Sequence, residues 1–268
     1  MTMAETPDEL HIDIVGDGPP LVLLHGWAMH GGVFAPLVDA LRADFTVHVV
    51  DLPGHGHSRG STLPLALEPV ADALAARLPR AAWLGWSLGG LFALEAARRH
   101  PQQVRALVML ASSPRFVRGD DWPHGMSAEI FQGFAHGLRH DYRATLDRFI
   151  ALEAFGSDDA RGEIRALRDE VFARGEPTAA VLADGLGLLE RSDLRDALPM
   201  LRMPGLWLAG RRDRLVSPRA MEAAAALAPD ARAQVFASAG HAPFLTHPDA
   251  VAEAVRAFAA GAGAQDLP

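Results

Sequence analysis

A serine lies between two glycines in the segment GWSLGG at residues 85–90, directly after the apolar run AAWL. Gly85 and Gly89 flank Ser87 in a G-x-S-x-G pattern, which is typical of a chain that turns sharply from a strand into a helix. Such a turn holds the serine in a strained conformation with its hydroxyl exposed above the sheet. We therefore predict that Ser87 is a nucleophile. The alternative is a glycine-rich turn that contains a serine by chance.

A serine hydroxyl needs a base to accept its proton, and imidazole is the usual one. The sequence has 12 histidines, so position must decide among them. His241 follows the last expected strand, and groups at the carboxyl ends of strands in an open α/β sheet converge on one crevice. We predict His241 as the base. His247 stands before Pro248 at an expected helix start, where a structural role is favoured.

The base needs a carboxylate that fixes its tautomer and stabilises the imidazolium. Asp213 lies a few residues beyond the expected strand 206–210 and one βα unit before His241. Taken alone, Asp213 would be interpreted as a surface carboxylate in an arginine-rich turn. Together with Ser87 and His241 it gives the chain order Ser, Asp, His, which is that of α/β-hydrolases. The three residues therefore predict a catalytic triad.

The negative charge that develops on an attacked carbonyl oxygen needs two preorganised donors. The backbone N–H of Leu88, the residue after the nucleophile, is the expected first donor. The second is expected from the loop HGWAMHGG after the strand 21–25, and the N–H of Trp27 is the candidate. The Trp27 indole is alternatively a core side chain or a wall of the pocket.

The elements that must position these residues alternate along the chain. Short apolar runs predict strands at 21–25, 46–50, 81–86, 105–112, 206–210 and 233–239. Helical patterns lie between and after them, at 33–45, 67–78, 88–100, 218–228 and 247–260. This alternation predicts an α/β fold with a mostly parallel, doubly wound sheet, in agreement with an α/β-hydrolase fold.

The alternation is interrupted between about residues 114 and 200, where helical stretches follow one another without strands. We interpret residues 114–195 as a helical cap inserted into the α/β-hydrolase core. The core then consists of residues 1–113 and 196–268.

Composition excludes several kinds of chemistry. The sequence has no cysteine and no lysine, which excludes disulfides, thiol catalysis and lysine-based mechanisms. A net charge of −8 argues against a nucleic-acid partner. No apolar run approaches the roughly 18 residues of a membrane span, and the acidic N-terminal segment lacks the pattern of a signal peptide. The expectation is a cytoplasmic monomer.

No metal or organic cofactor is expected. His55 and His57 form an H-x-H pair in the segment DLPGHGHSRG, but no third ligand has suitable spacing. The segment is typical of a proline- and glycine-containing turn after a strand. No glycine-rich phosphate-binding fingerprint is present.

Several motifs together resemble the pimeloyl-[acyl-carrier protein] methyl ester esterases of biotin synthesis. The matching segments extend from about residue 10 to 258 and are HGW, DLPGHGHSRG, GWSLGGL, ASSP, DWP, RFIALEAFG and HAPFLTHP. The resemblance implies a cofactor-free serine carboxylesterase that releases methanol from pimeloyl-acyl-carrier-protein methyl ester. It implies that Ser87, Asp213 and His241 are the triad, and that substrate contacts Trp27, Leu88, Phe149, Ile150, Ala151, Leu152 and Glu153.

The implied partner is an acyl-carrier protein, which is strongly acidic. Arg161, Arg165 and Arg168 recur at helical spacing in DARGEIRALRDE and would lie along one helix face. We hypothesise that Arg161 and Arg165 dock the carrier protein, with Arg143 and Arg148 as weaker candidates. The alternative is a solvated face balanced by neighbouring carboxylates.

Other functions remain open at this point. A different esterase or a lactonase of the same fold, acting on small aliphatic esters, would share the triad and differ in the cap. A dehalogenase is disfavoured because Ser87 stands where its aspartate would. A non-catalytic hydrolase-fold binding protein typically lacks a triad member, and here all three are present.

Overall fold

A seven-stranded sheet with the order β1-β3-β2-β4-β5-β6-β7 forms the centre of the computed structural model, which describes residues 10–155 and 157–264. Strand β1 runs antiparallel to β3, and the other neighbouring strands are parallel. The strands are β1 Ile12–Val15, β2 Pro20–Leu24, β3 Thr46–Val50, β4 Ala81–Trp86, β5 Val104–Leu110, β6 Gly205–Gly210 and β7 Ala231–Phe236. The predicted mostly parallel sheet is confirmed.

The six expected strands are all present, with small shifts at their ends. Strand β5 ends at Leu110 because Ala111 has a φ of 44°, which takes the chain out of the extended conformation. Strand β1 was not expected. It has only four residues at the edge of the sheet, and Ile14 is 62% exposed, so the sequence there carries no pattern of a buried strand.

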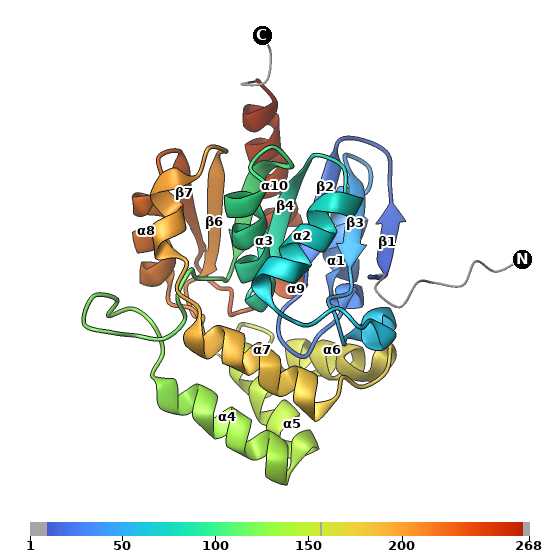
Figure 1. The fold of residues 1–268 in the computed structure, drawn as a ribbon, viewed down its shortest axis with the longest axis vertical. Helices are drawn as coiled ribbons and strands as arrows, with labels where there is room; N and C mark the ends of the chain where they lie inside the picture. The colour runs from blue at the N-terminus through green and yellow to red at the C-terminus, as the bar shows by residue number, and fades with distance from the viewer. Residues whose placement is uncertain (1–9, 156, 265–268) are drawn as a thin grey trace, which may run out of the picture.

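Helices cover both faces of the sheet (Figure 1). Helices α2 (Leu67–Arg77), α3 (Leu88–Arg99) and α8 (Pro218–Leu227) lie on one face, and α1 (Ala35–Leu41) and α10 (Pro248–Ala264) lie on the other. The expected helix 33–45 is shorter than predicted, because a 3-10 turn, η1 (Gly31–Phe34), precedes α1. Three further short elements are η2 (Gly56–Gly60), η3 (Arg195–Met200) and α9 (Pro243–Thr246).

Four consecutive helices lie between β5 and β6, in the region 114–195 that the sequence assigns to a cap. They are α4 Ala128–His140, α5 Tyr142–Glu153, α6 Ala160–Ala173 and α7 Ala179–Arg191. Figure 1 shows them gathered at one end of the sheet, where the parallel strands finish. Side chains cap three of these helices at their first turn, since Asp141, Asp159 and Thr178 accept hydrogen bonds from backbone N–H groups. The division into core and cap remains our proposal.

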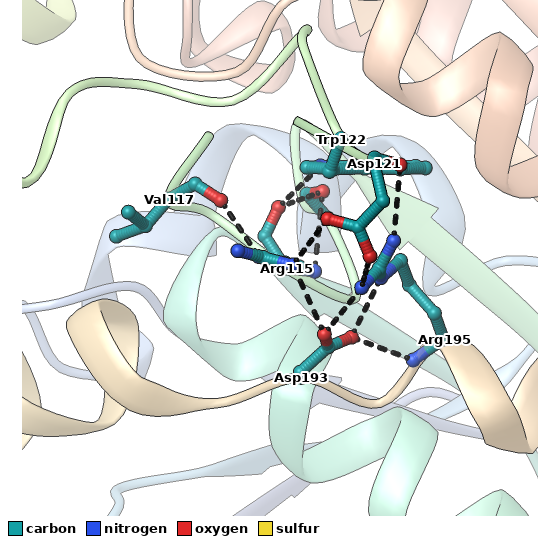
Figure 2. A network of polar contacts seen from close by, with 7 residues as sticks. Arg115, Val117, Asp121, Trp122, Asp193 and Arg195 are labelled. Carbon is teal, nitrogen blue, oxygen red and sulfur yellow. Dashed lines mark hydrogen bonds and ion pairs between the residues drawn. The ribbon is translucent and has the colours of Figure 1, made fainter. Parts of the chain in front are cut away.

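A polar network joins the two segments that connect these helices to the sheet (Figure 2). The Nη2 atom of Arg195 makes two ion pairs, each 2.7 Å long, one with Asp121 Oδ2 and one with Asp193 Oδ2. Arg115 reaches the same two carboxylates at 3.1 and 3.4 Å, and its carbonyl accepts the Trp122 indole N–H at 2.9 Å. The segment that follows β5 is thereby held against the segment that follows α7.

Candidate active site

Ser87 lies at the turn between β4 and α3 with φ 52° and ψ −119°, so the strained conformation expected of the elbow is confirmed. Its N–H donates to the Leu110 carbonyl at 3.0 Å, and its own carbonyl accepts the Ser112 hydroxyl at 2.6 Å. These bonds tie the elbow to the end of the neighbouring strand. The backbone around Ser87 is therefore fixed by its surroundings, which a strained conformation requires.

The two glycines of the pattern are required by close backbone approach. A Cβ on Gly85 would collide with the backbone of Gly89 in the following helix turn. A Cβ on Gly89 would collide with the carbonyl oxygen of Leu24 on the adjacent strand β2. No relaxation of a flexible side chain could relieve either collision, because the opposing atoms belong to the backbone.

His241 and Asp213 form a buried pair, and their side chains are both 0% exposed. His241 Nδ1 lies 2.8 Å from Asp213 Oδ2. The second oxygen, Oδ1, accepts the N–H groups of Leu215 and Val216 at 2.7 and 2.9 Å. These two donors hold the carboxylate in place, so that its other oxygen orients the imidazole. Asp213 is therefore placed as the sequence predicts, at the loop after β6.

His241 also contacts the elbow through Trp86, the residue before Ser87. The Trp86 indole N–H donates to the His241 carbonyl at 2.9 Å, and the two rings lie 5.8 Å apart. The remaining ring nitrogen, Nε2, is buried and makes no hydrogen bond to any residue in 10–155 or 157–264. That atom is free to accept a proton, as a general base requires.

The loop after β2 lies beside Ser87. A Cβ on Gly26 would come within 3.3 Å of the Ser87 Cβ, so this backbone passes directly next to Ser87. Ala28 has a φ of 65°, which marks a tight loop conformation. The Trp27 indole N–H donates to the Leu182 carbonyl of α7 at 2.8 Å, so the indole ties this loop to the cap helices. The Trp27 backbone N–H remains our candidate donor for the oxyanion.

His25 fixes the conformation of this loop, and the sequence analysis did not single it out. Its Nε2 accepts the Leu52 N–H at 2.9 Å, so Nδ1 carries the proton and donates to the Gly26 carbonyl at 2.8 Å. Burial lowers the His25 pKa to about 3, so the ring is neutral at physiological pH. The only sequence signal was its place in the HG pair at a strand end.

A second group that the sequence analysis missed is Asp51, at the end of β3. One oxygen accepts the Gly31 N–H at 2.6 Å and the other accepts the His57 N–H at 2.8 Å. Arg174, at the end of α6, places Nη1 3.2 Å from the same carboxylate. The buried charge is thus satisfied by two loops and by one arginine from the cap helices.

The cap residues implied by the resemblance differ in how they face the site. Phe149 is 4% exposed, and its ring lies 4.5 Å from the Trp27 ring. Ile150 and Glu153 are each 1% exposed, whereas Leu152 is half-buried and Ala151 is exposed. Phe149 therefore packs on the candidate oxyanion loop. Substrate contact by any of the five residues stays a prediction.

The candidate docking arginines fall into two groups. Arg161 and Arg165 on α6 are exposed and form no hydrogen bond or ion pair with the residues that the structure describes. Arg143 pairs with Glu176 and lies over the Phe172 ring, and Arg148 donates to the Thr145 hydroxyl. The first two guanidinium groups are therefore free to bind a partner.

The described residues hold no group of three or more histidines, aspartates or glutamates arranged as a metal site. His55 Nδ1 lies 3.0 Å from the Pro53 carbonyl oxygen, and the ring is buried. This contact indicates that His55 has a structural role within the turn. Among the described helices, none combines the length and apolar character that crossing a membrane requires.

A family model described as the alpha/beta hydrolase fold matches residues 19–248. A pimeloyl-[acyl-carrier protein] methyl ester esterase of Xanthomonas campestris is 60% identical, over 94% of this chain and 99% of that protein. The protein of the same name from Stenotrophomonas maltophilia is 57% identical, over 96% of this chain and 99% of that protein.

Solved structures show the same fold at lower identity. A thermophilic esterase from Thermogutta terrifontis superposes with a TM-score of 0.81 at 26% identity, covering 94% of this chain and 93% of that one. An enol-lactonase from Burkholderia xenovorans superposes with a TM-score of 0.80 at 24% identity, covering 94% and 96% of the two chains. At this identity, the similarity to the enol-lactonase shows only a shared fold.

Proposed function

The chain belongs to the alpha/beta hydrolase fold family and, within it, to the pimeloyl-[acyl-carrier protein] methyl ester esterases, and on that premise we propose that it hydrolyses the methyl ester of pimeloyl-acyl-carrier protein. The products are methanol and pimeloyl-acyl-carrier protein, which carries a free terminal carboxylate into biotin synthesis. The observation that best supports this proposal is the buried His241–Asp213 pair, which is joined through Trp86 to the strained turn at Ser87.

In the proposed mechanism Ser87 attacks the ester carbonyl carbon while His241 Nε2 accepts the hydroxyl proton. Asp213 holds the imidazole in the tautomer that leaves Nε2 free, and it stabilises the imidazolium. The imidazolium then protonates the departing methoxide, which leaves as methanol. A water molecule, activated by the same imidazole, attacks the acyl-enzyme and restores Ser87.

The oxyanion of each tetrahedral intermediate is assigned to the backbone N–H groups of Leu88 and Trp27. Leu88 begins helix α3, so its N–H has no partner within the helix and the helix dipole favours negative charge there. Trp27 follows Gly26, whose backbone passes beside Ser87. Donors that the fold fixes in advance need no reorganisation when the charge develops.

The partner is proposed to be the acidic acyl-carrier protein, which would dock on helix α6. Arg161 and Arg165 are exposed there without described partners, and a guanidinium can bind both carboxylates and the phosphate of a phosphopantetheine arm. With this partner we place the reaction in the cytoplasm. The monomeric state remains a prediction.

The proposal is tested by incubating the purified chain with synthetic pimeloyl-acyl-carrier-protein methyl ester and following methanol release and the mass of the carrier protein. We expect a loss of 14 Da, because the change from methyl ester to acid removes one CH₂. In parallel, the chain should restore growth without biotin to a strain that lacks this esterase. Hydrolysis of small esters with neither of these results would favour the alternative, an esterase or lactonase for small substrates.

A further inference from the structure

Two carboxyl groups from the cap helices lie against the loop that carries His241. Glu153 ends helix α5, and its backbone carbonyl accepts the His241 N–H at 3.3 Å. Glu163 lies in the first turn of α6 with its carboxyl near the backbone of Ala242, the residue after His241. The cap therefore meets the loop of the proposed base through the Glu153 backbone and the Glu163 side chain, and the triad mechanism uses neither glutamate.

Both carboxyl groups are removed from water. Glu153 is 1% exposed and Glu163 is 3% exposed. Neither carboxyl makes a hydrogen bond of ordinary geometry with the residues that the structure describes, although the Ser157 hydroxyl and the Ala242 N–H are near Glu163. Burying a carboxyl without a hydrogen-bond partner lowers the stability of the fold. Such groups are therefore candidates for a functional role.

Glu163 is surrounded by titratable groups from every neighbouring segment. Glu153 faces it from α5, Asp213 from the loop after β6, and His241 from the loop before α9. Glu163 also lines a cleft of about 370 Å³ between α6 and α9, together with Asp158, Asp159 and His247. Asp158 pairs with Arg212, and the Asp159 side chain caps α6. Glu163 is thus the carboxyl of the cleft that is placed to act on His241.

The two carboxyls differ in charge near neutral pH. Burial, with Glu163 and Asp213 nearby, raises the pKa of Glu153 well above its usual range, so Glu153 stays uncharged. Burial also raises the pKa of Glu163, but the Ser157 hydroxyl and the His241 charge oppose this, and the result is about 7. Glu163 therefore gains its negative charge in the pH range in which a serine esterase works.

We propose that Glu163 is a positioning residue for catalysis, whose carboxylate, brought by the cap, stabilises the His241 imidazolium that forms at each proton transfer. The proposal rests on the esterase activity proposed above. A negative charge acts more strongly where water is excluded, and Asp213 alone must otherwise balance the imidazolium. Uncharged Glu153 fills the space next to Glu163 without a third negative charge. The base would then be fully effective only with the cap helix α6 in place.

The direct test is an NMR titration of the His241 ring in the full chain and in the variant Glu163→Gln. Glutamine has the same shape as the protonated carboxyl, so folding is preserved while the charge is removed. We expect the His241 midpoint to fall by at least half a pH unit in Glu163→Gln. The matched control is Asp169→Asn, an exposed carboxylate on the same helix, which should leave the midpoint in place. An unchanged midpoint in Glu163→Gln would overturn the proposal, whatever the enzymatic activity.

The kinetic test uses p-nitrophenyl butyrate between pH 5.5 and 9. For Glu163→Gln at pH 8.5 we expect a three- to ten-fold lower kcat and a KM within about two-fold of the parent. At pH 5.5, where Glu163 is protonated in the parent as well, the two proteins should have similar rates. A uniform loss at every pH would point to a structural role and refute the proposal. An active parent with an unchanged Glu163→Gln profile would refute it too, without affecting the proposed function.

Discussion

His241 Nδ1 lies 2.8 Å from Asp213 Oδ2, and neither side chain is exposed to water. Because the other Asp213 oxygen is occupied by the Leu215 and Val216 N–H groups, the carboxylate has one orientation toward the ring. The backbone carbonyl of His241 in turn accepts a hydrogen bond from the indole of Trp86, the neighbour of Ser87. The proposed base is thus positioned through both its ring and its backbone.

Replacing Ser87, the proposed nucleophile, tests the site most directly. Ser87→Ala should fold like the parent, because it removes one oxygen and leaves the backbone bonds to Leu110 and Ser112 in place. Hydrolysis of p-nitrophenyl esters should fall by several orders of magnitude, and a fluorophosphonate probe should no longer label the protein. Retention of activity near the parent rate would show that another residue is the nucleophile.

The proposed role of Asp213 in the triad is tested with a pair of matched substitutions. Asp213→Asn should lower kcat by about 10³- to 10⁴-fold, because the amide favours the imidazole tautomer with its proton on the wrong nitrogen. Asp196→Asn, which changes an exposed residue of η3, should change kcat little. Steady-state kinetics of both variants check this. Small, equal effects would mean that the acid is a different carboxylate.

The docking proposal predicts a selective loss. Charge reversal at both Arg161 and Arg165 to Glu should lower kcat/KM for the carrier-bound ester by about ten-fold or more at low salt, and less at high salt, where screening weakens the attraction in any case. Small soluble esters should be hydrolysed as before. Equal kcat/KM on the carrier-bound ester would remove α6 as the docking surface, and a parallel loss on small esters would indicate a damaged cap.

The Glu163 carboxyl should make stability depend on pH in a defined direction. Its pKa is about 7 in the folded chain and 4.5 as an ordinary glutamate, so the folded state binds the extra proton between these values. Stability therefore falls as pH rises through this window, by up to about 3 kcal/mol in total. The variant Glu163→Gln has no ionisable group at this position, so its stability does not fall in this way. In urea unfolding it should match the parent near pH 4.5 and exceed it at pH 8.5, and a pH-independent difference would contradict this prediction.

Two glycine substitutions should have opposite effects on stability. Gly89→Ala places a Cβ against the Leu24 backbone carbonyl and should cost about 3 kcal/mol or prevent folding. Gly133→Ala lies inside helix α4 with open space around the new Cβ, and it should stabilise the protein by about 0.5–1 kcal/mol. Thermal unfolding of both variants checks the contrast. Similar effects would show that the elbow tolerates a side chain.

Much of the fold could be predicted because the signals were local. The strand 46–50 and the strand 81–86 were predicted with their correct ends, since each is a short, mostly apolar run. The strained Ser87 followed from the spacing of its glycines. Strand β1 escaped prediction because an edge strand with a half-exposed side needs no apolar pattern.

The site was only partly visible in the sequence. Ser87, Asp213 and His241 could be chosen because strand ends converge at one edge of a sheet. His25, Asp51 and Arg174 could not, because each acts through a contact with residues distant in the sequence. The buried Glu163 looked like one more charge on a solvated helix, and only its burial distinguishes it.

The sequence by itself determined the order of the six parallel strands, the glycine-flanked turn at Ser87 and the set of residues at the strand ends, because short-range backbone geometry and hydrophobic periodicity dictate these. Only the tertiary structure decided which polar groups lose water and which neighbours they meet. Charge state depends on that surrounding, since burial and nearby charges change the free energy of ionisation. The pairing of His241 with Asp213 therefore depends on how the loops after β6 and β7 pack, and the burial of Glu163 depends on the packing of α6 against the loop before α9.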